Sequence, residues 1–368
     1  MALEITLRPR PDPNDLVLTV AAQSIAGWTS VRVIRSIERM PNGFDIDLTF
    51  REATGFEIVV ADGDACTVAL GTDKVITGYV DTVTRGIEPR NRSIQIVGRS
   101  KSCDVVDCAA ELPKCFINGV TLPKLARDIA KTYGIDVRTD GADGAQLPPI
   151  AFARGTTGFS LIERAARWTG KLVYDNTDGS IQIGDLGSKR AASGFVEGRN
   201  IMRARAVTSQ AQRFSEIRAY LVPMDILANV VAQPSDTSKG DVDNVLAIEK
   251  DDNVKRRRMR AIIAESGIGG VDVCKKRALW EIARRKGRGL VVQLTCDSWR
   301  DADDKLWEPN TLAVVDAPSL KLNKVELCIG EVTYRRDEQG TRADLVLMPP
   351  DAFKPEPVLL TPNFAHFK

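Results

Sequence analysis

The stretch Phe44-Asp-Ile-Asp-Leu-Thr-Phe50 alternates apolar and polar side chains without interruption. A period of two is typical of a β-strand that buries one face. Residues 29–37, rich in β-branched side chains, precede it, and Met40-Pro-Asn-Gly43 supplies a turn between the two strands. Further strand patterns follow at residues 66–70, 75–82 and 93–97. Several short strands joined by Gly and Asn turns predict an antiparallel barrel or sandwich.

From about residue 100 the hydrophobic period becomes helical. One amphipathic helix is predicted from residue 122 to 133, with Thr121 as its N-cap and Gly134 as its stop. A second is predicted over residues 158–169, and two short strands follow it. This middle segment is therefore expected to be a small α+β domain.

One strand pattern lies at residues 217–222, and one long helix is predicted over residues 272–286. After this helix, strand patterns return at residues 290–296, 312–315, 325–334 and 343–347. A polar loop is expected at 233–244, and the proline-rich residues after 348 are expected to form an extended tail.

Two strand-loop-strand segments resemble each other when Gly78 is set against Gly330, an offset of 252 residues. Each has a strand, a loop, a strand with an internal glycine, a turn and an alternating strand. The glycine is expected to mark a bulge or a close backbone approach. Any two antiparallel hairpins look somewhat alike, so coincidence stays an alternative to a true repeat.

The predicted fold class is mainly β with an α+β insert: two barrel-like antiparallel β domains related by a pseudo-repeat, plus a small α+β domain. The expected boundaries are residues 1–98 for the first β-barrel domain, 99–189 for the α+β domain, 190–348 for the second β-barrel domain with a helical insertion, and 349–368 for the tail. If the repeat is real, a cyclic trimer would place six similar units around one axis.

Composition excludes several classes of protein. The net charge of +2 gives no overall reason to expect a nucleic-acid binder. Seven cysteines, an odd number scattered along the chain, are typical of reduced thiols in a protein made in a cytoplasm. No signal-peptide pattern begins the chain, and no apolar run approaches the roughly 18 residues that a membrane helix needs.

Residues suited to catalysis or metal binding are sparse. The single histidine, His366, lies in the tail, so histidine-based triads are not expected. The acidic run from Asp297 to Glu308 resembles a calcium loop at first sight, but Trp299 and Ala302 stand where a ligand and a glycine are needed. We therefore predict no catalytic residue, no metal and no cofactor.

Two other groups of residues could act in binding. Lys255, Arg256, Arg257, Arg258 and Arg260 form a basic cluster that suits a solvated surface, a protein interface or the lining of a channel. In a channel, some of these side chains could meet passing DNA. The second group, Trp28, Trp299 and Trp307, could anchor either a core or an interface, with the core as the first expectation.

Seven short motifs follow one another along the chain: Gly27-Trp-Thr-Ser-Val31, Arg35-Ser-Ile-Glu38, Gly98-Arg-Ser-Lys101, Asp107-Cys-Ala-Ala110, Arg213-Phe-Ser-Glu216, Asp297-Ser-Trp299 and Leu306-Trp-Glu-Pro-Asn310. In this order they resemble the baseplate hub (tail) proteins of Mu-type phages. The likeness runs from about Gly27 to Phe353 and departs at both ends of the chain.

The resemblance implies a homotrimer whose protomers each carry two tube-like β-barrel domains, forming a pseudo-hexameric ring. One face of that ring would dock the hexameric tail tube protein, and the other would hold the trimeric baseplate spike protein. It also implies contacts with other baseplate proteins, in a virion part made in the bacterial cytoplasm.

Two other functions stay open. A nucleic-acid- or carbohydrate-binding β-barrel protein would be a monomer or dimer with a ligand groove. A tail-associated peptidoglycan hydrolase would need paired carboxylates, which the sequence does not place on one scaffold, although distant ones could meet in space.

Overall fold

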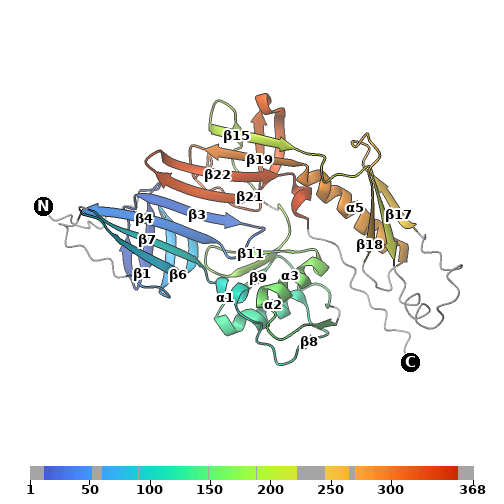
Figure 1. Cartoon of the computed structure of the whole chain (residues 1–368), viewed down its shortest axis with the longest axis horizontal. Coiled ribbons are helices and arrows are strands. Elements are labelled where there is room, and N and C mark those ends of the chain that lie inside the picture. The colour runs from blue at the N-terminus through green and yellow to red at the C-terminus, as the bar shows by residue number, and fades with distance from the viewer. Residues whose placement is uncertain are drawn as a thin grey trace.

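The computed structural model describes residues 12–51, 60–89, 91–147, 149–187, 189–221, 245–264 and 270–354. The chain is mainly β, as predicted, and fourteen of the described strands form one continuous sheet (Figure 1). Its two halves curve as barrel-like layers, but the strand pairing does not close on itself.

The first half of the sheet, called module 1, is antiparallel. Its strands are β1 (Leu16–Val20), β2 (Gln23–Ile25), β3 (Ser30–Ser36), β4 (Gly43–Arg51), β5 (Ala65–Leu70), β6 (Asp73–Ile87) and β7 (Asn91–Ser100). The alternation that begins at Phe44 forms β4, with Phe44 and Ile46 buried as the period of two requires.

The second half, called module 2, comes from the end of the chain. Its strands are β13 (Lys189–Arg190), β14 (Phe195–Val196), β15 (Ile201–Thr208), β19 (Leu290–Cys296), β20 (Thr311–Ala317), β21 (Leu322–Asp337) and β22 (Gly340–Met348). Short 3-10 turns, η3 (Pro318–Leu320) and η4 (Pro350–Phe353), follow β20 and β22. One apolar core runs beneath both modules.

The two modules repeat one strand order. Module 1 reads β3-β4-β7-β6-β5 and module 2 reads β15-β19-β22-β21-β20, with every neighbouring pair antiparallel. Matching two series of five strands in the same order is far more specific than two similar hairpins. The pseudo-repeat is therefore present in the fold.

The residue alignment of the repeat differs from the one predicted. A bulge interrupts β6 between Val80 and Thr82, and the equivalent bulge in β21 lies between Ile329 and Glu331. Matching the bulges sets Glu331 on Thr82, an offset of 249 residues (331 minus 82) rather than 252. The sequence match failed because it aligned two glycines with different roles.

The predicted roles are divided between the two glycines. Gly330 lies within the β21 bulge. Gly78 is instead a close approach, since a Cβ there would lie 1.8 Å from the carbonyl oxygen of Arg99 on the neighbouring strand. Only a residue without a side chain fits at that point.

The α+β insert lies beside module 1 and has a core of its own. Its elements are α1 (Cys103–Asp107), β8 (Phe116–Ile117), α2 (Leu122–Ala130), η2 (Lys131–Tyr133), β9 (Val137–Thr139), β10 (Ile150–Ala151), α3 (Gly158–Thr169), β11 (Leu172–Asp175) and β12 (Ile181–Gly184). Both predicted helices are confirmed: the Thr121 side chain caps α2 by accepting from Lys124 N at 3.4 Å, and Gly134 follows η2 with a φ of 63°.

A separate arm projects from module 2 (Figure 1). It consists of β16 (Glu216–Leu221), β17 (Val245–Lys250), β18 (Met259–Ala264) and the long helix α5 (Gly270–Arg288), packed around Ile217, Ala219 and Ala278. The sequence predicted the helix and one strand of this arm but not the unit. The predicted polar loop at 233–244 and most of the proline-rich tail lie outside the described residues.

Candidate assembly site

The two modules meet where the first strands of the chain pair with nearly the last. Strand β3 pairs antiparallel with β21, from Val31 opposite Arg336 to Ser36 opposite Glu331. Figure 1 shows β3 lying directly beside β21 at the centre of the sheet. The backbone bond from Ile37 N to Gly330 O, 3.0 Å long, extends this pairing. This junction makes one rigid sheet of the two modules.

The loop between β19 and β20 covers the junction with aromatic side chains. The Trp299 indole is fully buried and donates from Nε1 to the carbonyls of Arg335 at 3.0 Å and Arg342 at 2.9 Å. Tyr334 of β21 donates its hydroxyl hydrogen to the carbonyl of Trp307, and its ring meets Trp299 edge-on. Burial raises the pKa of Tyr334 to about 12, so its hydroxyl stays protonated and remains a donor.

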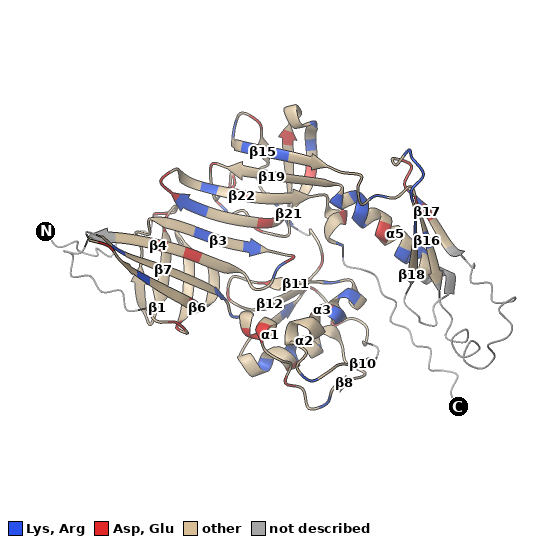
Figure 2. Ribbon diagram, viewed as in Figure 1, with Lys and Arg blue, Asp and Glu red and all other residues tan. Residues whose placement is uncertain are grey.

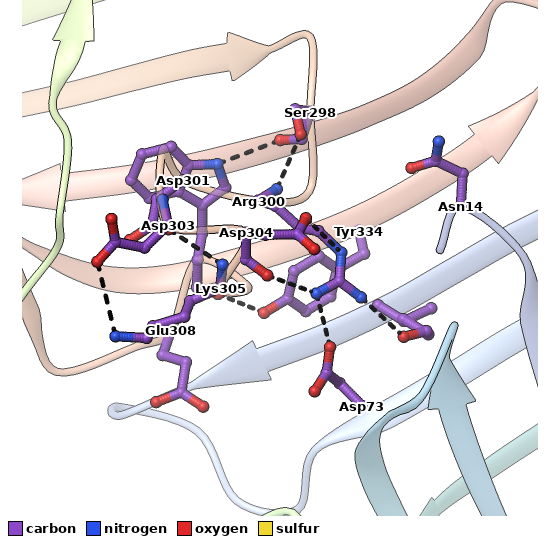
Figure 3. Close-up of polar contacts among 12 residues, drawn as sticks. Asn14, Asp73, Ser298, Arg300, Asp301, Asp303, Asp304, Lys305, Glu308 and Tyr334 are labelled. Carbon is purple, nitrogen blue, oxygen red and sulfur yellow. Dashed lines mark hydrogen bonds and ion pairs between the residues drawn. The ribbon is translucent and has the colours of Figure 1, made fainter. Parts of the chain in front are cut away.

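Arg300 ties this loop to module 1, as Figure 3 shows. Its guanidinium donates to Asp73 Oδ2 at 2.6 Å and to the carbonyl of Leu70 at 3.1 Å, both in the hairpin between β5 and β6. It also donates to the carbonyl of Asp304 at 2.8 Å within its own loop. The Arg300 side chain is only 9% exposed, whereas the Asp73 side chain is 48% exposed, so the charge-assisted pair lies at the edge of the buried junction.

Further ion pairs cross between the modules around this point. Arg336 of β21 reaches Asp15 at 2.9 Å, and Arg39 reaches Glu331 at 2.7 Å. The mostly buried Arg35 of β3 lies 3.8 Å from Glu308 of the covering loop. Several separated contacts therefore hold the modules in one fixed relation.

The acidic loop itself is organised by Asp301 and not by a calcium-type arrangement. Asp301 Oδ1 accepts from the backbone amides of Asp303 at 3.0 Å and Lys305 at 3.1 Å, and its Oδ2 accepts from Ala192 N at 3.0 Å. The carboxylate oxygens are thus taken up by the protein's own amides (Figure 3). Within the described ranges, no three His, Cys, Asp or Glu side chains are grouped as metal ligands.

A second joint fixes the α+β insert to module 1. Asp175, at the end of β11, is 2% exposed and accepts from Asn42 N at 2.8 Å and from Ser100 Oγ at 2.5 Å. Burial raises the pKa of this carboxyl, and the donated hydrogen bonds oppose the shift. These buried hydrogen bonds therefore fix the position of the insert relative to module 1.

All three predicted tryptophan anchors are buried inside the chain. Trp28 packs in the core of module 1 and donates to the carbonyl of Ile25 at 3.2 Å. Trp307 stacks obliquely on Phe195 with ring centroids 4.4 Å apart, and donates to the carbonyl of Ser298 at 3.2 Å. Together with Trp299, they belong to the one core that both modules share.

The predicted basic cluster is divided by the structure. Arg258 donates to the carbonyls of Gln210 and Ala211, both at 2.8 Å, and Arg260 lies 3.6 Å from Glu281. Both guanidinium groups also lie over the ring of Phe214, so they are part of the arm's own packing. The side chains of Lys255, Arg256 and Arg257 are exposed at the end of the arm, where Figure 2 shows a basic loop beside β17.

Sequence reasoning missed the most important polar residues of the two joints, Arg35, Arg300 and Asp175. Arg35 lies in one of the motifs that carry the family resemblance, and Arg300 directly follows another. The position of Arg35 and Arg300 in or next to these motifs was the one signal in the sequence that could have identified them. The partners of Arg35, Arg300 and Asp175 lie in distant segments of the chain, so no local sequence pattern predicts these contacts.

None of the helices in the described part of the chain has the length and apolarity to cross a membrane. A surface hollow of about 410 Å³ lies between Thr208, Arg213 and Pro349. It is partly open to solvent, which does not suit tight binding of a small ligand.

Comparison with known proteins agrees with this architecture. Residues 15–100 match the family described as Mu phage baseplate assembly protein GpP-like, N-terminal. Residues 102–185 match the second domain of the baseplate hub protein gp44-like family, and residues 271–356 match the fourth domain of Mu phage baseplate assembly protein GpP.

Whole-chain relatives include the baseplate hub protein gp44 of Escherichia phage Mu, 30% identical over 344 residues, which cover 92% of this chain and 89% of that protein. Among solved structures, the 43 kDa tail protein of prophage MuSo2 from Shewanella oneidensis is 28% identical, with a TM-score of 0.80 over 92% of this chain and 99% of that one. The tail protein of Neisseria meningitidis MC58, 17% identical, shares the fold with a TM-score of 0.77 over 94% of this chain and 99% of that one. The chain belongs to the family of Mu-type phage baseplate hub proteins, structural components of phage tails.

Proposed function

We propose that three copies of this chain form a ring with pseudo-sixfold symmetry, which joins a hexameric tail tube to a trimeric spike. In this role the protein makes and breaks no covalent bond. It acts by presenting rigid surfaces that keep the tube and the spike in register.

The repeated strand order of the two modules is the observation that carries this proposal. Each module presents the same five-stranded series, and β3 and β21 join the two series within one chain. Because the modules are similar, three chains around a threefold axis would offer six comparable surfaces to a hexameric partner. A protein with one such module would need six copies to do the same.

Partners with sixfold and threefold symmetry are expected to bind different parts of the chain. The modules, which correspond to the domains predicted at residues 1–98 and 190–348, would dock the tail tube protein, because only they are duplicated. The α+β insert within residues 99–189 and the arm occur once per chain, so they suit threefold partners: the spike and other baseplate proteins. A chain of the Francisella PdpA-VgrG complex, 8% identical, shares this fold at a TM-score of 0.57, which supports the architecture alone.

Oligomeric state tests the proposal directly. Light scattering coupled to gel filtration should give three times the 40.3 kDa of one chain at micromolar concentrations. Class averages from electron microscopy should show a ring with six similar lobes. A stable monomer or dimer across that concentration range contradicts the proposal and favours a separate β-barrel binding protein.

A second candidate role is contact with DNA passing through the ring. Lys255, Arg256 and Arg257 are exposed, and none of the three forms an ion pair with a carboxylate of the described residues. Reversing the charges of Arg256 and Arg257 should then lower DNA delivery while particles still assemble. Normal delivery by assembled particles removes this role. Reversal of two exposed basic residues of the insert, Lys114 and Arg154, changes the net charge equally and is the matched control.

A further inference from the structure

The two parts of the chain that occur only once leave the sheet at the same end of its strands. The α+β insert follows the end of β7, and the arm lies between the end of β15 and the start of β19. The turn between β3 and β4 contacts both parts: Asn42 N donates to Asp175 of the insert, and Glu38 pairs with Arg288 of the arm. At this end, called the insert rim, the two modules therefore carry different structures.

The opposite end of the strands carries one hairpin from each module. In module 1, the hairpin from β6 to β7 closes with two backbone hydrogen bonds between Glu88 and Asn91, 2.9 and 3.3 Å long. In module 2, the hairpin from β21 to β22 closes with Asp337 opposite Gly340. Each closing pair with the two residues inside it is called a tip: tip 1 is 88–91 and tip 2 is 337–340. Figure 1 shows the hairpin of β21 and β22 pointing to the left, away from the arm.

The two tips stand equally far from the equivalent bulges. Glu88 follows Thr82 by six residues, and Asp337 follows Glu331 by six residues. Six residues of extended strand span about 20 Å, so a difference of only two residues would displace one tip by about 7 Å. The modules are therefore matched in length at this end of the strands, although they differ at the insert rim.

The junction between the modules indicates how the strands would lie in a ring. Modules 1 and 2 are neighbours across β3 and β21, so the sheet passes from one module to the next across its strands. In a ring of such modules the ends of the strands form two rims, with both tips of each chain at the same rim. Modules related by rotation about the ring axis hold equivalent residues at one level, which would set six tips in one plane.

We propose that tips 1 and 2 form the surface that docks the hexameric tail tube, and that the insert rim takes the threefold partners. This inference rests on the proposed ring and specifies which end of it meets the tube. A ring of six identical subunits needs six alike contacts at one level. Within the described residues, the tips meet this need twice per chain, whereas the insert and the arm each occur once.

The two tips also share a chemical group at one equivalent position. Glu88 and Asp337 differ by the same 249 residues as the bulges, so they occupy matching places in the repeat. The side chain of Glu88 is exposed, and that of Asp337 is 36% exposed although it pairs with Arg342. Six tips would present a carboxylate at the same point, which favours basic or N–H groups at the six receiving sites of the tube.

Attaching a bulky group at one site at a time tests which rim meets the tube. The tip variants are Glu88→Cys and Glu338→Cys, and Glu111→Cys in the insert is the matched control, since all three replace an exposed carboxylate. Each variant also carries Cys108→Ser and Cys115→Ser, because these are the two native thiols that are not buried. The new thiol of the purified full-length chain is then labelled with a maleimide polyethylene glycol, and light scattering identifies the labelled trimers.

The probe is the purified tail tube protein of the same phage, and its binding to hub trimers is measured by co-sedimentation and by electron microscopy. A tag on either tip should lower the affinity for the tube at least about tenfold, whereas a tag at position 111 should change it by less than about twofold. Each unlabelled variant should bind the tube as the parent does, which shows that the tag and not the substitution blocks the contact.

A second pair of variants repeats the test at neighbouring positions of the same loops. Pro89→Cys and Gln339→Cys also place a thiol at an exposed position of tip 1 and tip 2. They should lose tube binding on labelling to the same extent as the first pair. Agreement between the two pairs separates obstruction of the tip from a local defect at one substituted residue.

The other outcomes separate this inference from the proposed ring. Trimers tagged at the tips that bind the tube normally overturn the tip contact and leave the ring standing, and so do trimers that lose binding only through the insert tag. Loss of binding from one tip alone contradicts the equal use of both modules. Tip thiols that stay unlabelled in folded trimers show that the tips are covered, which also overturns the contact. Monomers by light scattering, in variants whose circular dichroism matches the parent, overturn both the ring and the contact.

Discussion

Replacing Tyr334 with Phe removes a single oxygen atom from the centre of the junction. The ring, its edge-on contact with Trp299 and the packing volume stay the same. What is lost is the hydrogen bond from the hydroxyl to the carbonyl of Trp307. Because Tyr334 is fully buried, no water replaces the donor, and the carbonyl is left without this partner.

The expected loss of unfolding free energy is about 1–3 kcal/mol, the cost of leaving a buried acceptor unsatisfied. The loss should shrink at high pH. The pKa of Tyr334 is raised from 10.0 to about 12 by burial, so folding opposes ionisation of the parent. The parent therefore loses stability as pH rises from about 10 to about 12, whereas the Phe variant lacks that group and does not.

Urea unfolding followed by tryptophan fluorescence measures this difference, because Trp299 and Trp307 report on the junction. The matched control is Tyr133→Phe in the insert, whose hydroxyl donates to the carbonyl of Ala109 at 3.2 Å in an exposed setting. That control should change stability by less than about 0.5 kcal/mol. Equal effects of the two substitutions would refute the claim that burial of the hydrogen bond matters.

Three further substitutions test other parts of the framework, each by urea unfolding. Gly78→Ala should lower the unfolding free energy by at least about 2 kcal/mol, because the new Cβ would clash with the backbone of the neighbouring strand. Gly86→Ala is the control and should lower it clearly less, because its Cβ would meet only a serine hydroxyl. Equal losses would contradict the close approach at Gly78. Asp73→Asn should cost about 1 kcal/mol by weakening the ion pair with Arg300, and no change would mean that this tie adds nothing to stability. Asp175→Asn should be at least as stable as the parent at pH 7. Because the pKa of the Asp175 carboxyl is raised, this group stabilises the fold most below its ordinary pKa of 3.8, and the contribution is lost as the pH rises through the folded-state pKa. A large loss of stability at pH 7 would show that the charge itself is required.

Local features of the fold were predictable because they depend on neighbours in the chain. The strict alternation from Phe44 predicted β4, and the cap at Thr121 and the stop at Gly134 predicted the limits of a helix. The helix over residues 158–169 was placed at its observed ends. In each case the signal comes from a period or a cap that is contained in a few residues.

Strand partnership was not predictable in the same way. The parallel pairing of β16 with β18 has the same period of two as an antiparallel pair, so the pattern does not reveal its direction. The repeat was recognised, but its alignment was wrong by three residues, because Gly78 marks a close approach and Gly330 a bulge, and the sequence does not distinguish the two roles. The junction contacts join segments about 300 residues apart and have no local signature.

The late arrival of β21 has a consequence for synthesis. Strand β3 emerges from the ribosome early, but the strand that covers its open side is translated only near the end of the chain. Until then the open edge of β3 has no partner strand in the nascent chain, and an unpaired strand edge favours mispairing and aggregation. Products truncated before β21 would keep that edge exposed, so translation through Asp337 is a condition for covering it.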